Sequence, residues 1–296
     1  MKVHKTILIC FSLVFLNCKE NKIETTLNGD GEIIEKKIYG EDNELLKTVE
    51  YYDRNPKQEY KITFKKKDFD SIIYFYDNGK VFKTGKRDLK SQLLGTWNLF
   101  DRDGHKREIR EFVTYEGKAA LNRAWFLSSE GDTLAWRDED IVFNQKEFMY
   151  DTLAVRHTSY NFFKFNKDTI RLNEPLRGVA YCFSPLLEEH GSKIRVIVDS
   201  ENNRFNSDYS NEDDISVQVY SNLEIDTSNQ KWFSNIKGRN LKYTAIFGDW
   251  FETTGPKTIR GYMEEYALGP FEDSDADSIT SRTFFEKKIV VLDSVE

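Results

Sequence analysis

Short runs in which apolar and polar residues alternate make up most of the chain, and turn-forming dipeptides separate them. Such runs are typical of β-hairpins when an Asn-Gly or Asp-Gly pair lies between them. The strands that this pattern predicts in the first third are residues 32–39, 45–52, 59–64, 72–76, 95–100 and 106–113. The turns between them fall at Asp30-Gly31, Asp42-Asn43, Asn78-Gly79 and Asp103-Gly104. A succession of hairpins is therefore expected in this part.

The hairpin pattern contains an internal repeat. Residues 74–81 read YFYDNGKV, and residues 98–105 read NLFDRDGH, with the segment GTW immediately before the second copy. An aromatic residue before a polar-Gly turn, followed by Gly-x-Trp-x-x-aromatic, resembles the MORN-like variant repeat of bacterial envelope proteins and antitoxins. The resemblance implies stacked hairpins over residues 28–112, with a scaffold or binding role. The alternative is a set of generic hairpins with Asn-Gly turns, which leaves the number of repeats open.

Beyond residue 113 the glycine-turn repeat stops and more varied short strands follow. They are predicted at residues 118–127, 133–136, 141–143, 159–165, 169–172, 178–183, 193–198, 215–221, 241–247, 257–266 and 282–292. Many short strands favour a β-sandwich or jelly-roll-like domain over residues 113–296. One or two helical turns are expected at residues 185–191, after Ser184 as a possible N-cap. Residues 257–266 and 284–291 resemble the endings of uncharacterised lipoprotein families, to which no function attaches.

The chain begins with a short basic segment and an apolar run over residues 6–16. A membrane-spanning helix needs about 20 apolar residues, so this run predicts a signal peptide over residues 1–17 instead. It ends in FLNC and then turns polar, which resembles a bacterial lipobox with Cys18 as the lipidated residue. That resemblance implies a short tether at residues 18–27 and an envelope protein anchored to the outer membrane, either periplasmic or surface-exposed. The alternative is ordinary cleavage nearby that leaves Cys18 unmodified.

The composition of the chain excludes some classes of function. The net charge of −7 argues against nucleic acid as a partner. The cysteines are Cys10, Cys18 and Cys182. If Cys10 leaves with the signal peptide and Cys18 takes lipid, Cys182 has no disulfide partner, and its apolar surroundings predict a buried thiol. Stability must then come from aromatic packing, for which 22 Phe, 15 Tyr and 5 Trp are available.

No motif for catalysis or for a cofactor occurs, so no cofactor is expected. Acidic clusters lie at residues 138–140 and 212–214 and in the last loop. Two facing carboxylates are what a glycosidase requires, although most acidic clusters are solvated loops. In the last loop Asp273, Asp275 and Asp277 have the spacing of calcium ligands, but Ser278 and Phe284 occupy the EF-hand Gly and Glu positions. A calcium site outside the EF-hand class remains the hypothesis there.

Aromatic residues near presumed loops provide the other candidate site. Trp232, Trp250 and Phe251 are candidates for stacking on sugar rings or filling a partner's pocket, with burial in the core as the alternative. Three functions follow for a lipid-anchored envelope protein. The leading hypothesis is non-catalytic protein interaction or scaffolding; the alternatives are glycan binding and hydrolysis by a carboxylate pair in the C-terminal domain.

Overall fold

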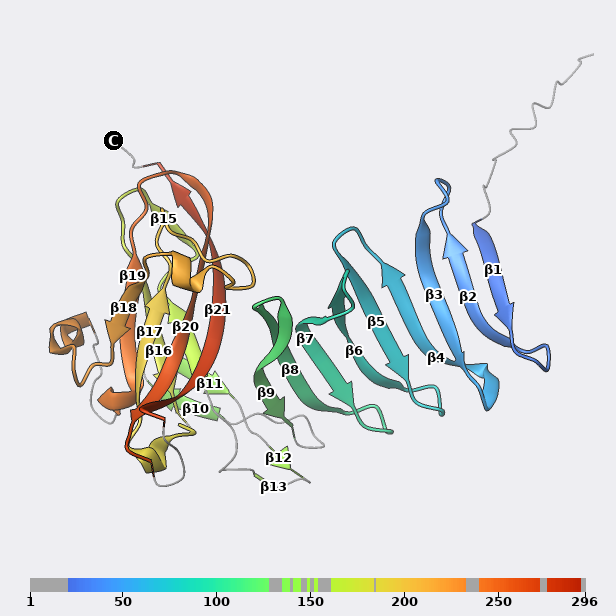
Figure 1. Cartoon of the computed structure of the whole chain (residues 1–296), viewed down its shortest axis with the longest axis horizontal. Helices are drawn as coiled ribbons and strands as arrows, with labels where there is room; N and C mark the ends of the chain where they lie inside the picture. Colours follow the sequence, from blue (N-terminus) through green and yellow to red (C-terminus); the bar gives the residue numbers. More distant parts are fainter. Residues whose placement is uncertain are drawn as a thin grey trace, which may run out of the picture.

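The structure is a computed structural model, and it is mainly β. It describes residues 21–127, 135–138, 141–144, 148–149, 152–153, 161–183, 185–232, 240–271 and 276–293. The predicted signal segment and the predicted lipidation site Cys18 lie outside these ranges. Two units follow one another along the chain: a long meandering sheet, and a pair of packed sheets (Figure 1).

The first unit, called the array below, is a nine-stranded antiparallel sheet in which each strand pairs with its neighbours in sequence. Its strands are β1 Lys22–Leu27, β2 Ile33–Tyr39, β3 Leu45–Tyr52, β4 Asn55–Lys65, β5 Phe69–Phe75, β6 Val81–Asp88, β7 Leu93–Phe100, β8 Lys106–Tyr115 and β9 Lys118–Phe126. The sheet is longer than the predicted range 28–112 at both ends. Residues 118–127, predicted as a strand of the second domain, pair with β8 and complete the array.

All four predicted turns are confirmed. Gly31, Asn43, Gly79 and Gly104 each have a positive φ, the conformation that such tight turns require. The turns at Gly79 and Gly104 have the same hydrogen bonds: each glycine N–H donates to the carbonyl of the residue three positions earlier, at 3.0 Å. The two copies of the sequence repeat therefore fold into equivalent turns.

Tyrosines connect successive hairpins. Tyr52 donates its hydroxyl proton to the carbonyl of Phe75 at 2.6 Å, and Tyr76 donates to the carbonyl of Phe100 at 2.8 Å. Each bond reaches from the end of one hairpin to the corresponding position of the next. The apolar residues Ile72, Tyr74 and Trp97 form the small core of the array.

The second unit is a β-sandwich of two sheets. The three-stranded sheet has the order β14-β16-β19, and the five-stranded sheet β15-β21-β20-β17-β18. The bounds are β14 Asn161–Phe165, β15 Thr169–Arg171, β16 Leu176–Cys182, β17 Lys193–Val198, β18 Gln218–Ser221, β19 Thr244–Asp249, β20 Gly255–Leu268 and β21 Ser278–Leu292. Both sheets contribute to one buried core, with Ala180 and Phe247 from one side and Ile194 and Met263 from the other. Cys182 is buried in this core, as expected.

Short elements complete the described chain. Two small antiparallel pairs are formed by β10 Ala135–Asp138 with β11 Ile141–Asn144, and by β12 Phe148–Met149 with β13 Thr152–Leu153. The 3-10 helices are η1 Glu188–His190, η2 Glu212–Asp214, η3 Thr227–Trp232 and η4 Leu241–Tyr243. The helical turn predicted at residues 185–191 is thus the single turn η1. Within the described ranges, every helix is far too short to cross a membrane.

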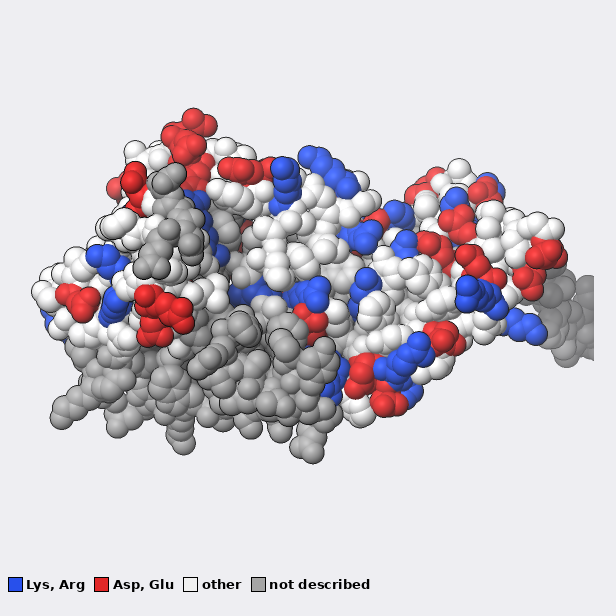
Figure 2. All heavy atoms as spheres, turned by 60° about the horizontal axis from the view of Figure 1, so that its bottom comes forward, with Lys and Arg blue, Asp and Glu red and all other residues white. Residues whose placement is uncertain are grey.

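The end of the array docks on the outer face of the five-stranded sheet. The side-chain amide of Asn122 donates to the carbonyl of Phe284 at 2.9 Å and accepts its N–H at 2.8 Å. The rings of Tyr115 and Phe284 lie 5.2 Å apart, and the N–H of Glu116 donates to the carbonyl of Asp208. On the face that Figure 2 shows, acidic and basic side chains are intermixed at the two ends of the molecule, and mainly basic ones lie over its middle.

Candidate functional site

A shallow pocket of about 200 Å³ lies at one end of the three-stranded sheet, where β16 begins and β19 ends. Arg177 pairs with Gly248 in the register of these two strands. We call this the tryptophan pocket; its lining consists of Pro175, Leu176, Arg177, Tyr220, Asn229, Trp232, Ile246, Phe247, Gly248 and Trp250.

The backbone around Gly248 explains the shape of the pocket floor. A Cβ at Gly248 would lie 2.5 Å from the carbonyl oxygen of Leu176, so only glycine allows the two strands to approach this closely. The carbonyl of Gly248 accepts the hydroxyl proton of Tyr220 at 2.6 Å. This bond joins β18 of the five-stranded sheet to β19 and fixes one wall of the pocket.

Two exposed tryptophans define the rim. Trp232 ends the 3-10 helix η3 and is 50% exposed, and Trp250 directly follows β19 and is 62% exposed. The guanidinium carbon of Arg177 lies 3.8 Å from the centroid of the Trp232 ring, a cation–π contact. Large aromatic side chains left in water beside a pocket are typical of binding surfaces.

A buried charge network lies behind Trp250. Asp249 accepts the N–H of Trp250 at 2.9 Å, and Arg204 bridges Asp199 at 2.7 Å and Asp249 at 3.5 Å. Burial raises the pKa of Asp249 to about 6, although the Trp250 N–H and the Arg204 guanidinium oppose this rise. The backbone position of Trp250 is therefore coupled to the charge of a buried carboxylate.

The neighbouring loop is held by a second acid. Glu201 accepts from the N–H of Glu252 at 2.5 Å, from Lys257 at 2.6 Å and from the hydroxyl of Thr253. Burial acts to raise the pKa of Glu201, but these bonds outweigh it and lower that pKa to about 2. The chain after Trp250 is thus fixed by an acid that stays ionised near neutral pH.

The structure brings together two of the three predicted aromatic residues. Trp232 and Trp250 line one pocket, but Phe251 is only 1% exposed and belongs to the sandwich core, so it is removed from the candidate set. The prediction failed there because the neighbours Trp250 and Phe251 differ in burial, and residue type alone does not predict which of two adjacent aromatic side chains enters the core. Arg177, Tyr220 and Asn229 were not predicted, since no local pattern connects them to the tryptophans.

The proposed metal ligands are only partly described. Asp277 is exposed, and its carbonyl accepts the N–H of Gly269, while Asp273 and Asp275 lie outside the described residues. Within the described ranges no three His, Cys, Asp or Glu side chains are grouped as a metal site would require. The calcium hypothesis for this loop stays a prediction.

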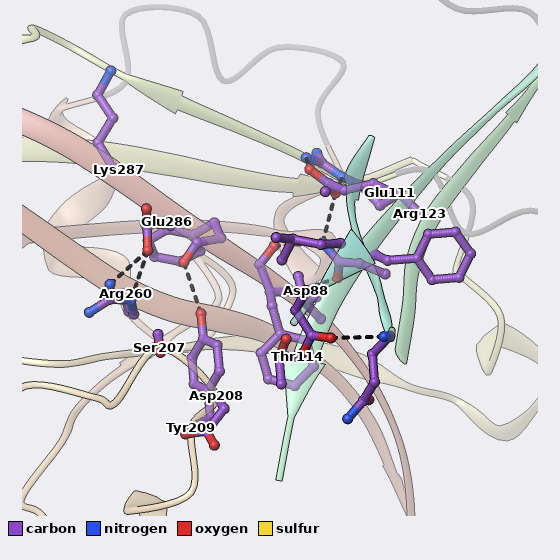
Figure 3. A pocket seen from close by; sticks show the side chains of 18 of the residues that line it. Asp88, Glu111, Thr114, Arg123, Ser207, Asp208, Tyr209, Arg260, Glu286 and Lys287 are labelled. Carbon is purple, nitrogen blue, oxygen red and sulfur yellow. Dashed lines mark hydrogen bonds and ion pairs between the residues drawn. The ribbon is translucent and has the colours of Figure 1, made fainter. Parts of the chain in front are cut away.

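A larger cleft of about 750 Å³ lies between the array and the sandwich, and we call it the junction cleft (Figure 3). Strands of both units and the segment 207–209 line it. Its charged lining residues are Asp88, Lys90, Glu111, Arg123, Asp208, Arg260, Glu286 and Lys287. Acids and bases are equally represented in that lining, so the cleft does not favour a ligand of either charge.

Partners within the protein already occupy the carboxylates of the junction cleft. Glu111 accepts two bonds from Arg123, at 2.6 and 2.9 Å, and Glu286 accepts from Arg260 at 2.9 Å. Asp88 caps its own turn by accepting the N–H groups of Lys90 and Gln92. Figure 3 shows the Arg260–Glu286 pair on the sandwich wall of the cleft and the Glu111–Arg123 pair on the array wall.

The geometry does not assemble the acid pair of a glycosidase among the described residues. A general acid needs a pKa raised toward neutrality. Burial raises the pKa of Asp199 and of Asp249, but both carboxylates are buried and neither lines the tryptophan pocket or the junction cleft. Their shifts come from a structural network with Arg204.

Comparison with known proteins adds little. No family model matches the chain, and no curated protein matches it. A solved structure of a polysaccharide lyase is similar over 95% of this chain with 9% identity and a TM-score of 0.24. The match covers 48% of the lyase, so the chain spans about half the length of that protein. A likeness at this level carries no argument about the fold or the function here.

Proposed function

We propose that this protein is a glycan-binding lipoprotein of the cell envelope, and that the tryptophan pocket holds a sugar ring. The observation that carries the proposal is that Trp232, at the end of η3, and Trp250, after β19, are both exposed and line one pocket. The flat face of an indole packs against the apolar C–H face of a pyranose, and the polar rim satisfies its hydroxyls.

Polar groups suited to hydroxyls surround the tryptophans. Asn229 uses its amide nitrogen to donate to Asp226 at 2.6 Å, so its amide oxygen is the group left to face a ligand. The hydroxyl of Tyr220 is held between the carbonyl of Gly248 and the side chain of Gln218, so Tyr220 forms a fixed part of the pocket wall. Among the described residues, the charged side chain in the lining is that of Arg177, which stacks on Trp232.

The small volume of the tryptophan pocket sets the expected affinity for a glycan. Pockets for drug-sized ligands span about 300–1,000 Å³, so a site of about 200 Å³ accommodates one ring and leaves the rest of a glycan in solvent. We expect a Kd of about 1 mM for a single sugar unit, equivalent to about −4 kcal/mol. Several molecules on one membrane would bind a polymer more tightly through multivalency.

A panel of immobilised glycans, probed with the wild-type protein and with Trp250→Ala, tests the assignment of the tryptophan pocket as a glycan site. We expect signals from a defined group of neutral glycans that the variant loses. Leu89→Ala is the matched control, because Leu89 is a large apolar side chain that is 69% exposed on the array and distant from the pocket. Retained signals in Trp250→Ala, or capture of peptides instead of glycans, would favour the protein-interaction hypothesis.

The array is proposed to act as a spacer for this site. Its first strand β1 lies at the end opposite the sandwich (Figure 1). Neighbouring strands are about 4.8 Å apart, so nine strands extend over about 38 Å. With lipid on Cys18, which precedes β1 closely in sequence, the array would hold the sandwich away from the membrane surface.

Fatty-acid labelling of wild type and Cys18→Ala tests the proposed lipid anchor, and equal labelling of the two proteins would contradict it.

A further inference from the structure

Asp249 lies between two residues that line the tryptophan pocket, although its own carboxylate is in the interior. Gly248 precedes it and Trp250 follows it, and both belong to the pocket lining. Asp249 is only 4% exposed and is not part of that lining. Its Oδ1 accepts the backbone N–H of Trp250 at 2.9 Å. The rim of the pocket is therefore joined by a direct hydrogen bond to an acid inside the sandwich.

Three acids and two bases form the charged network around this carboxylate among the described residues. Lys257 binds Glu201 at 2.6 Å, and Arg204 binds Asp199 at 2.7 Å. Arg204 also lies 3.5 Å from Oδ2 of Asp249, the longest of these ion pairs. When all five groups are ionised, one negative charge is left without a close partner, and the distances leave it on Asp249.

Hydrogen bonds make the same distinction between the two buried aspartates. Asp199 accepts from Arg204 at 2.7 Å and from two backbone N–H groups at 3.2 and 3.1 Å. Asp249 accepts one bond of ordinary length, from Trp250. A buried carboxylate with few donors takes up a proton readily, because its neutral form costs less to bury. Asp249 is therefore the acid of this network that changes its charge.

The pKa values follow from these surroundings. Burial raises the pKa of Asp249 to about 6, although the bond from the next N–H and the charge of Arg204 oppose this rise, and the charges of the other two acids add to it. Burial also raises the pKa of Asp199 against the same guanidinium, whereas hydrogen bonds lower that of Glu201 to about 2 against the effect of burial. From β18, Tyr220 faces this group as well, since the charge of Asp249 adds to burial in raising the pKa of its hydroxyl.

Arg204 gives the network a second arrangement. Its Nη2 is buried and has no hydrogen-bond partner among the described residues. Its guanidinium carbon lies 5.5 Å from the centroid of the ring of Phe251, the residue after Trp250. An ionised Asp249 attracts this guanidinium and offers an acceptor to Nη2, whereas protonation at Oδ2 removes most of that attraction. The charge of Asp249 therefore changes the contacts of the segment that carries Trp250.

We propose that Asp249 is a positioning residue of the tryptophan pocket, and that a single proton on its carboxylate controls the rim. The ionised form accepts the Trp250 N–H in a charge-assisted bond, about twice as strong as the bond to a neutral group. It holds Trp250 in the binding position, and protonation releases it. The pocket should then bind a glycan more weakly as the pH falls below about 6. This last step rests on the proposed function, whereas the release of Trp250 does not.

The network sets stability against binding. The neutral form of Asp249 stabilises the fold because no charge is buried, whereas the ionised form holds the rim. Asp249→Asn resembles the neutral form. This variant should therefore be more stable than wild type near neutral pH and yet bind a glycan more weakly. Weaker binding that arises from damage to the fold would come with lower stability instead.

The backbone amide signal of Trp250 in nuclear magnetic resonance tests the switch without any glycan. In wild type its chemical shift should follow one titration curve with a midpoint at a pH of about 6, and in Asp249→Asn it should stay constant. Asp168→Asn is the matched control, because it removes the same charge from a side chain that is 83% exposed and outside the pocket lining. It should titrate as wild type does. A signal that fails to titrate in wild type, or that still titrates in Asp249→Asn, would overturn the proposal.

Calorimetry with a glycan then tests the consequence for binding. We expect the wild-type Kd to be about fivefold higher at about pH 5 than at about pH 7.5, and Asp249→Asn to show the weaker Kd at both. By reciprocity, saturating glycan should lower the midpoint of the Trp250 titration. Equal wild-type Kd values at the two pH values would overturn the control of binding by Asp249. If Trp250 titrates as expected but no glycan binds at either pH, the proposed function fails and the positioning of Trp250 by Asp249 stands.

Discussion

The guanidinium group of Arg177 stacks on the ring of Trp232, with the guanidinium carbon 3.8 Å from the ring centroid. Arg177 belongs to β16, inside the sheet, whereas Trp232 ends a short 3-10 helix between sheets. The contact therefore ties an exposed indole to a rigid strand. An aromatic side chain that is already ordered loses less entropy when a ligand binds, so the stack preorganises the tryptophan pocket.

Arg177→Ala should weaken glycan binding without unfolding the sandwich. An exposed cation–π contact contributes about 0.5–1 kcal/mol, so we expect a Kd about two- to fivefold higher. Isothermal titration calorimetry with a glycan selected from the immobilised panel measures the change in Kd. The control is Arg171→Ala, which removes an exposed arginine of the same unit that does not line the pocket. Equal affinities of Arg177→Ala and wild type would contradict a role for the stack.

The stability of the sandwich should depend on pH through Asp249. Its pKa in the fold, about 6, is above the ordinary value of 3.8, so the folded protein binds this proton more tightly than the unfolded chain. Its stabilising contribution is fully present below pH 3.8 and is lost as the pH rises through 6. Asp249→Asn mimics the neutral form. We therefore expect its Tm to rise relative to wild type as the pH increases from about 4 to 7; parallel Tm curves would contradict the shift.

Asn122→Ala should weaken the attachment of the array to the sandwich. The substitution removes both amide bonds to the backbone of Phe284 and leaves two part-buried groups without partners. We expect the free energy of unfolding to fall by about 1–3 kcal/mol, with the array and the sandwich melting as separate transitions in calorimetry. Gln58→Ala is the control, since that amide donates only to the adjacent Glu59 carbonyl. A single transition at the wild-type Tm would show that other contacts hold the junction.

Gly85→Ala should destabilise the array through the ring of Trp97. The added Cβ would lie 2.1 Å from that ring, and Trp97 is buried, so the indole must move. Overpacking of this kind costs about 1–3 kcal/mol, which chemical denaturation would measure. Gly29→Ala is the matched control, because its Cβ would meet nothing within 4 Å. Equal stabilities of the two variants would mean that the indole relaxes freely.

Local patterns predicted most of the strands, because turn residues and alternation act over a few residues. The strands that local patterns missed show the limit of this information. The segment 22–27 reads KIETTL and is exposed throughout, so it has no buried face to produce alternation. The segment 81–88 reads VFKTGKRD, in which Gly85 and three cations interrupt the apolar alternation. The strand is fixed instead by pairing with β5 on one side and β7 on the other.

The candidate site was predictable only in part. Trp232 and Trp250 were recognisable as aromatic residues near loops, and the structure confirms that both are exposed. Their meeting in one pocket depends on the pairing of β16 with β19 and on the bond from Tyr220 to Gly248. These contacts join distant segments, so no window of sequence contains them. The burial of Phe251 beside the exposed Trp250 was equally unpredictable from the local pattern.

The chemical shifts of the tryptophan indole N–H groups during a glycan titration test the proposed function most directly. We predict that the indole signals of Trp232 and Trp250 move together on one saturation curve. The signal of Trp97, whose N–H is bonded to the carbonyl of Lys86 at 3.0 Å, should stay in place and serve as the internal reference. Saturable binding that leaves the signals of Trp232 and Trp250 unmoved would contradict glycan binding in the tryptophan pocket.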